Sequence, residues 1–188
     1  MQTNSFFIPG NYYLIFNHSN GGEIIFKKRD NYFYFLKKHD QYMSETWQLI
    51  SWCILPENYI LLVRVKENFP GMHWNEINKL IYSRFGNFTN AYAKALNKAF
   101  ARKGSVFARK FKRTQLAKEH IKKEIINIHL LPVKHQLVTS PFDWQFSSCN
   151  KIHAYTHDPQ LIHMLSFFEN AEQFLSLHLN KEEMKEAA

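Results

Sequence analysis

The sequence predicts an α+β fold, with an antiparallel sheet that carries helices on one face and a helical extension at the C-terminus. Three observations lead to this prediction. An aromatic and β-branched run at residues 11–18 ends at the turn signal Ser19-Asn20-Gly21-Gly22. Two apolar runs at 46–54 and 59–65 are separated by a short link, and residues 74–100 carry a long helical repeat.

The first half of the chain supplies three expected strands and one helix. Residues 11–18 have the composition of a strand, and a short apolar run follows at 23–26. A helix capped by Asp30 or Asn31 should continue to Met43, because its apolar residues recur at roughly helical spacing. The link Leu55-Pro56-Glu57-Asn58 is so short that the strands on either side of it should form a hairpin.

The second half begins with the helix at 74–100, which Gly86 can bend. We expect an edge strand at 106–111 and a helix at 116–131 that stops before Pro132. The resulting order, strand, helix, two strands, helix, strand, helix, is typical of a ferredoxin-like (RRM-like) sandwich. A further helical stretch at 160–179 has one apolar stripe, which should dock on the body or on a second copy of the chain.

Length and composition favour one compact domain with an appendage. The chain has 188 residues, of which 45% are hydrophobic and 16% aromatic, so it can bury a sizeable core. We expect a domain at 1–150 and an extension at 151–188. The sequence has neither a long apolar run nor the pattern of an export signal, which predicts a cytoplasmic protein without membrane contact. Cys53 and Cys149 have no second cysteine nearby, so neither a zinc site nor a disulfide is expected.

The positive charge is concentrated in one segment. The formal net charge is +8, and residues 98–123 hold ten basic residues against the single acid Glu119, which is 10 − 1 = +9. The rest of the chain is therefore close to neutral, at 8 − 9 = −1. A local basic segment of this kind indicates a phosphate backbone as partner.

Three sequence blocks, in order, resemble one known family. The blocks are 51–63, with its Cys-Ile-Leu-Pro stretch, 84–113, with Arg-Lys-Gly-Ser-Val-Phe, and 126–148, with Ile-His-Leu-Leu-Pro-Val-Lys-His. Together they are similar to the IS200-like single-tyrosine (HUH) transposases, which include the REP-associated tyrosine transposases. The resemblance covers most of residues 11–150. It implies the same fold and an ancestry in DNA strand cleavage and transfer through a phosphotyrosine intermediate.

The resemblance also implies that the catalytic residues have been lost. The family holds a divalent metal such as Mg²⁺ with two strand histidines, and their places are Asn58 and Ile60 in this sequence. The nucleophilic tyrosine corresponds to Asn127, and a third metal ligand corresponds to Leu131. Asparagine is a weak ligand and isoleucine is none, so we expect no bound metal, no cofactor and no intact catalytic residue.

The same resemblance places the basic loop and edge strand beside the DNA. The expected nucleic-acid contacts are Arg102, Lys103, Arg109, Lys110, Lys112 and Arg113. The aromatic residues Phe85, Phe88 and Tyr92 could stack on bases, although helical spacing of this kind is more typical of a core.

These observations predict a transposase-like protein that binds single-stranded or hairpin DNA without cleaving it. Two alternatives remain open at this point: an active single-strand transposase or nuclease with a rearranged metal site, and an RNA-binding or protein-interaction module on the same fold. The resemblance also implies a homodimer.

Overall fold

The computed structural model describes residues 6–154 and 159–179 and shows a four-stranded antiparallel sheet. The strands are β1 (Tyr12–His18), β2 (Trp47–Ile54), β3 (Asn58–Val65) and β4 (Lys112–Leu116), in the spatial order β2-β3-β1-β4. With one helix between β1 and β2 and another between β3 and β4, this is the ferredoxin-like topology. The predicted fold class is confirmed.

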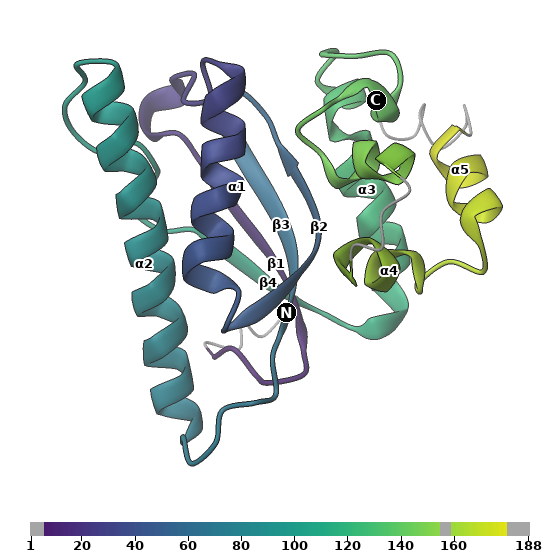
Figure 1. The fold of residues 1–188 in the computed structure, drawn as a ribbon, viewed down its shortest axis with the longest axis horizontal. Coiled ribbons are helices and arrows are strands. Elements are labelled where there is room, and N and C mark those ends of the chain that lie inside the picture. Colours follow the sequence, from purple (N-terminus) through teal and green to yellow (C-terminus); the bar gives the residue numbers. More distant parts are fainter. Residues whose placement is uncertain (1–5, 155–158, 180–188) are drawn as a thin grey trace.

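The helices α1 (Arg29–Met43) and α2 (Trp74–Ala99) cover one face of the sheet (Figure 1). Strand alternation turns Tyr13 and Ile15 of β1 toward these helices, where they join the larger of two apolar clusters. The helix α2 runs for 26 residues, and Gly86 does not break it. Its residues Phe85, Phe88 and Tyr92 are at most 3% exposed, which confirms the core interpretation of this aromatic set.

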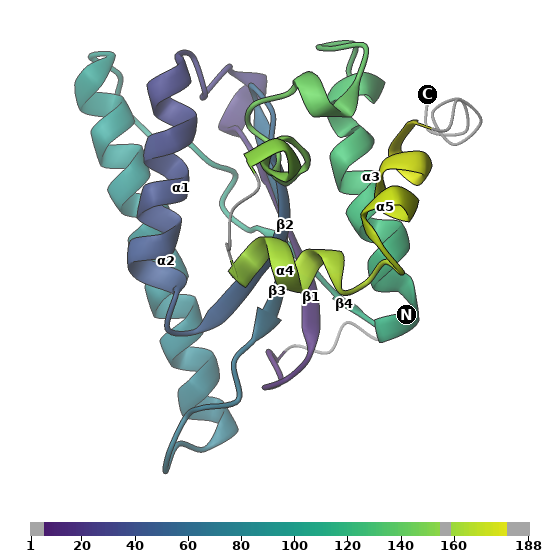
Figure 2. The same cartoon turned by 45° about the vertical axis from the view of Figure 1, so that its right-hand side comes forward.

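The opposite face of the sheet packs mainly against α3 (Ile121–Lys134), which lies over β2. The C-terminal extension forms α4 (Pro159–Leu165) and α5 (Ala171–Leu179), and Figure 2 shows both on the α3 side of the sheet. The extension therefore docks on the body of its own chain, which is one of the two expected arrangements. Short 3-10 helices lie at Asn20–Gly22, Lys118–His120, Pro141–Asp143 and Ser148–Ala154.

The predicted edge strand at 106–111 is wrong. Val106 and Phe107 both pack into the apolar cluster under α1 and α2, whereas consecutive residues of a strand point to opposite faces, and only an isolated bridge joins Phe107 to Ser19. The edge strand β4 lies further along the chain and pairs with β1 from Tyr12 to Phe16. The expected helix at 116–131 accordingly starts late, at Ile121, because Leu116 belongs to the strand.

Two helix ends also differ from the expectation. Pro132 lies inside α3, where its ring falls in the last turn and the helix continues to Lys134. The expected helix at 160–179 is broken between Leu165 and Ala171. At this break the side chain of Asn170 accepts a hydrogen bond from the backbone N–H of Gln173 at 2.8 Å, so a new helix N-terminus is capped there. Residues 180–188, the last part of the expected extension, lie outside the described residues.

Over the described ranges, no helix combines the length and the apolar character needed to cross a lipid bilayer.

Candidate functional site

A groove runs between α2 and residues 104–113, which include the loop before β4 and the start of that strand. It consists of two hollows of about 510 Å³ and 450 Å³, and Tyr82, Arg109 and Phe111 line both, so the hollows adjoin. We call this surface the α2 groove. Its other polar or charged lining residues are Asn17, Thr89, Asn90, Lys94, Asn97, Ser105, Lys110 and Arg113.

The α2 groove is electropositive. Lys94, Arg109 and Lys110 are exposed to solvent along it. Within the described part of the chain, none of the residues that line either hollow is acidic. Cations without neighbouring carboxylates form a surface that attracts phosphate groups.

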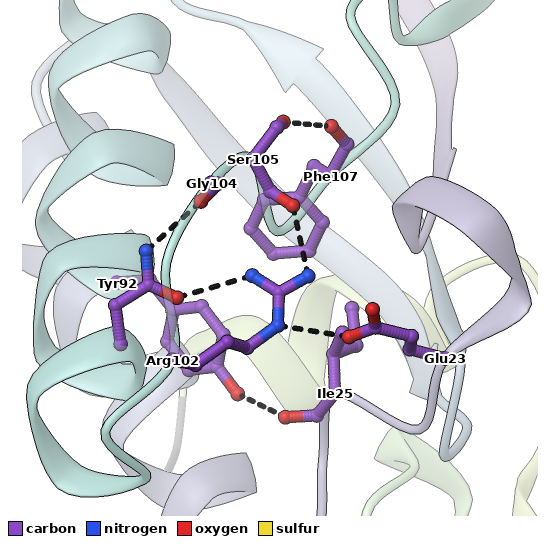
Figure 3. A network of polar contacts seen from close by, with 8 residues as sticks. Glu23, Ile25, Tyr92, Arg102, Gly104, Ser105 and Phe107 are labelled. Atoms are coloured by element: carbon purple, nitrogen blue, oxygen red, sulfur yellow. Dashed lines mark hydrogen bonds and ion pairs between the residues drawn. The ribbon is translucent and has the colours of Figure 1, made fainter.

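Arg102 holds the wall of the groove in place (Figure 3). Its Nε donates to Glu23 at 2.8 Å, one terminal nitrogen donates to Asn97 Oδ1 at 3.1 Å, and the other donates to the Ser105 carbonyl at 2.9 Å. Hydrogen bonding by Arg102 holds the pKa of Glu23 below its usual value. Asn97 in turn donates to the Gly104 carbonyl at 2.9 Å, so the loop is tied to α2 at two points.

Arg113 lies at the other end of the groove and contacts aromatic rings. Its guanidinium carbon is 4.5 Å from the centre of the Phe7 ring, and Nη1 donates to the Tyr82 hydroxyl at 2.9 Å. The cation–π contact and the hydrogen bond fix the orientation of this side chain. Tyr82 itself is 43% exposed, so part of this side chain is accessible to solvent.

The remaining two basic candidates lie outside the α2 groove. Lys103 is an exposed loop residue that lines neither hollow. Lys112 belongs to β4 and projects to the opposite face of the sheet from Arg113, where its Nζ is 5.9 Å from the centre of the Phe16 ring. The six predicted residues therefore do not form one patch: Arg109, Lys110 and Arg113 line the groove, and Arg102 shapes it.

Sequence reasoning missed the contribution of α2 to this surface. Tyr82, Gly86, Asn90 and Lys94 follow one another at intervals of four residues, so they share one face of the helix and line the groove. This stripe lies next to the apolar stripe of the same helix. The sequence alone assigns it no role, because the loop from Gly104 that forms the other wall of the groove comes from a later part of the chain.

The positions matching the family's strand histidines lie on β3 and face α3. Asn58 and Ile60 are partly buried, and in the pairing with β1 they lie opposite His18 and Phe16. Ile60 packs against the smaller of the two apolar clusters. The sequence did not indicate a role for His18 or Phe16, because their position beside Asn58 and Ile60 depends on the strand register.

The other two positions lie on α3, on the same side of the sheet. Asn127 is partly buried, and Leu131 packs against the same apolar cluster as Ile60. The structure thus brings both pairs to one side of the sheet. Ile60 and Leu131 have no donor atom, and Asn58 offers only an amide, so these residues do not fit a divalent cation.

Tyr59, the tyrosine between these two positions of β3, is not placed to act as a nucleophile. Its side chain points to the opposite side of β3 from Asn58 and Ile60 and belongs to the core under α1 and α2. It is 0% exposed, and burial raises the pKa of its hydroxyl. A buried phenol with a raised pKa cannot reach or attack a phosphate.

The fold is similar to those of two solved structures. A REP-associated tyrosine transposase bound to a REP hairpin has a TM-score of 0.63 and 15% identity, over 82% of this chain and 86% of that one. A bacterial tRNA(His) guanylyltransferase-like protein in complex with GTP has a TM-score of 0.50 and 8% identity, over 71% of this chain and 67% of that one. No protein-family model and no curated protein matches the chain. The likeness shows a transposase-like fold.

Proposed function

We propose that this protein binds single-stranded or hairpin DNA through the α2 groove and does not cleave it. The observation that carries the proposal is the groove itself, with Lys94, Arg109 and Lys110 exposed along it and no carboxylate in its described lining. Contacts from such cations to phosphates supply affinity that is independent of base sequence. The solved structure of similar fold that contains a REP hairpin supports nucleic acid of this form as the ligand.

The shape and chemistry of the groove favour an unpaired or distorted strand over a regular duplex. The partly exposed Tyr82 lies beside Arg109 and Arg113, which places an aromatic side chain next to cations. Proteins that bind single strands commonly combine these two features, because an unpaired base can stack on an aromatic ring while its phosphates contact basic side chains.

The absence of cleavage follows from the chemistry of four positions. Phosphotyrosine formation needs a hydroxyl where this chain has Asn127, and metal ligation needs donors where it has Ile60 and Leu131. Asn58 alone offers at most one weak ligand. A cytoplasmic location and a homodimer stay predictions that accompany this proposal.

Two assays on the full chain test the proposal. We expect fluorescence anisotropy to give tighter binding of a tailed DNA hairpin than of a duplex of equal length or an RNA hairpin. If three phosphates are contacted, the logarithm of the binding constant should fall with the logarithm of salt concentration with a slope of about −2 to −3. Equal affinity for RNA and DNA hairpins, or affinity independent of salt, would sink the DNA assignment.

The second assay addresses catalysis. The protein is incubated with single-stranded hairpin DNA and Mg²⁺ or Mn²⁺ and then separated under denaturing conditions. We expect neither nicked strands nor a covalent protein–DNA adduct. An adduct that forms with either metal would instead support the active enzyme with a rearranged site.

A further inference from the structure

Three metal-binding side chains meet in the interior on the α3 side of the sheet, away from the α2 groove. His129 comes from α3, Cys149 from the 3-10 helix Ser148–Ala154, and His178 from α5. All three residues are 0% exposed. One nitrogen of each imidazole and the Cys149 sulfur lie within 4.8 Å of one another. Figure 2 shows α3 and α5 side by side at this place.

Hydrogen bonds fix the proton positions of the two imidazoles. The Nδ1 of His178 lies 2.6 Å from the Phe174 carbonyl, which can only accept, so this nitrogen carries the proton. Nε2 of His178 therefore presents a lone pair, and it lies 2.8 Å from Nδ1 of His129. In the metal-free protein, His129 must donate its Nδ1 proton across this contact.

The other ring nitrogen of His129, Nε2, can form a hydrogen bond whether or not it carries the proton. Its Nε2 lies 2.7 Å from Ser148 Oγ and 3.1 Å from Ser51 Oγ, and a hydroxyl can donate or accept. Ser148 Oγ also lies 3.3 Å from the Trp52 carbonyl, so its own proton has a second acceptor. A register shift in β2 between Leu49 and Ser51 allows Ser51 to face α3 in this way.

If the His129 proton moves from Nδ1 to Nε2, His129 Nδ1 and His178 Nε2 both carry lone pairs, and one nitrogen of each ring lies within 4.8 Å of the Cys149 sulfur. Each imidazole then donates its outer N–H to a protein oxygen, the Phe174 carbonyl for His178 and the Ser148 hydroxyl for His129. Outer hydrogen bonds of this kind orient histidines that ligate metals and increase their basicity.

We propose that His129, Cys149 and His178 form a structural site for a thiophilic d¹⁰ cation that fastens α5 to α3. One thiolate with two imidazoles suits Cu(I), for which three donors are sufficient, and Zn(II), which adds a fourth ligand. Binding releases the Cys149 thiol proton to solvent and moves the His129 proton to Nε2. No residue is oxidised or reduced.

The site differs in place and in donors from the positions that match the family's metal ligands, Asn58, Ile60 and Leu131. Its proposed role is to stabilise the docked extension, and the DNA contact through the α2 groove does not depend on it. A result showing that no metal binds would therefore not contradict the proposed DNA binding. A result showing that no DNA binds would likewise not contradict the metal site.

The test uses the reduced full chain, both in its native state and during refolding. One titration adds Cu(I) in competition with a chromogenic Cu(I) chelator, and a second adds Co(II) as a probe for Zn(II). We expect one equivalent of one of these cations to bind. Co(II) binding should produce a thiolate-to-metal charge-transfer band in the near ultraviolet. The arm that saturates at one equivalent identifies the cation.

Two cysteine variants provide a matched pair. Cys149→Ser should abolish stoichiometric binding and the charge-transfer band, whereas Cys53→Ser, which removes the other buried thiol, should retain both. Circular dichroism checks that each variant is folded. Alkylation followed by mass spectrometry gives a second readout on the unmutated chain. During partial unfolding, bound metal should slow the alkylation of Cys149. The alkylation of Cys53 should be less affected. Absence of a stoichiometric cation in the unmutated chain, or binding retained in Cys149→Ser, would overturn the proposal.

Discussion

Acidification should destabilise this protein through one buried histidine of the main core. His39 of α1 is 3% exposed, and its Nε2 accepts a hydrogen bond from Trp47 Nε1 at 2.9 Å. Its ring stacks on Trp47 and meets Phe88 edge to face. Burial lowers the pKa of His39 from 6.5 to about 3, because a charged imidazole loses its hydration there.

The sign and size of the effect follow from this pKa. Between pH 6.5 and 3 the unfolded state binds a proton at His39 and the folded state does not, so the free energy of unfolding falls as the pH falls through this window. Above pH 6.5 His39 is neutral in both states and contributes no pH dependence. From pH 6.5 to 3 the loss amounts to about 5 kcal/mol, at about 1.4 kcal/mol per pH unit, and about 3.5 kcal/mol of it falls above pH 4. This is a large part of the total stability of a typical domain.

The assay is urea unfolding at a series of pH values from 7.5 to about 4. The variant His39→Gln keeps a side-chain oxygen that can accept the Trp47 hydrogen bond and cannot bind a proton in this range. We expect it to be less stable than the unmutated chain at pH 7 by about 1 to 2 kcal/mol and to lose less stability on acidification. Burial also lowers the pKa of His178 to about 4, and that contribution remains in both proteins, so their difference isolates His39.

If His39→Gln shows the same pH profile as the unmutated chain, the assignment of a neutral, desolvated His39 is wrong.

Three further predictions concern the groove, the core and the positions that match the family's catalytic residues. Arg102→Ala should weaken hairpin binding measured by anisotropy, because the hydrogen bonds from Arg102 to Glu23 and Ser105 are lost. Unchanged affinity together with an unchanged melting temperature would contradict the positioning role of Arg102. Phe107→Ala should lower the free energy of unfolding by about 3 to 5 kcal/mol, since the ring is 7% exposed; a loss below about 1 kcal/mol in denaturant titration would place this ring outside the core. Asn127→Tyr alone should form no covalent DNA adduct with Mg²⁺, because the metal ligands are still missing; an adduct on a denaturing gel would refute that reasoning.

Much of the fold could be predicted because its signals are local. The Ser19 to Gly22 turn, the short Leu55 to Asn58 link and the apolar stripe of α2 each depend on residues close together in the sequence. The break before Ala171 was also local, in the Asn170 and Gln173 pair, and a capping analysis could have found it.

Other features depend on distant contacts and could not be predicted. The segment at 106–111 has the composition of a strand, yet Val106 and Phe107 both turn to the same apolar cluster, and the pairing with β1 begins only at Lys112. The basic segment was predicted as one nucleic-acid surface. Its division between the two faces of the sheet follows from the exact start of β4, which composition does not determine.

The buried cluster of His129, Cys149 and His178 shows the same limit. The sequence argues against a zinc site, because Cys53 and Cys149 each lack a second cysteine nearby. His129 and His178 are 49 residues apart, and only the packing of α5 on α3 brings them to Cys149.

DNA binding by the α2 groove is tested most directly by one pair of variants. Arg109→Ala/Lys110→Ala removes two cations from the groove, whereas Lys118→Ala/Lys123→Ala removes two exposed cations of the same basic segment outside it. We predict that the groove variant binds the DNA hairpin about 10 to 100 times more weakly and has a salt dependence shallower by about 1.5, while the control variant binds nearly as the unmutated chain does. Equal losses in the two variants, or a larger loss in the control, would contradict the account.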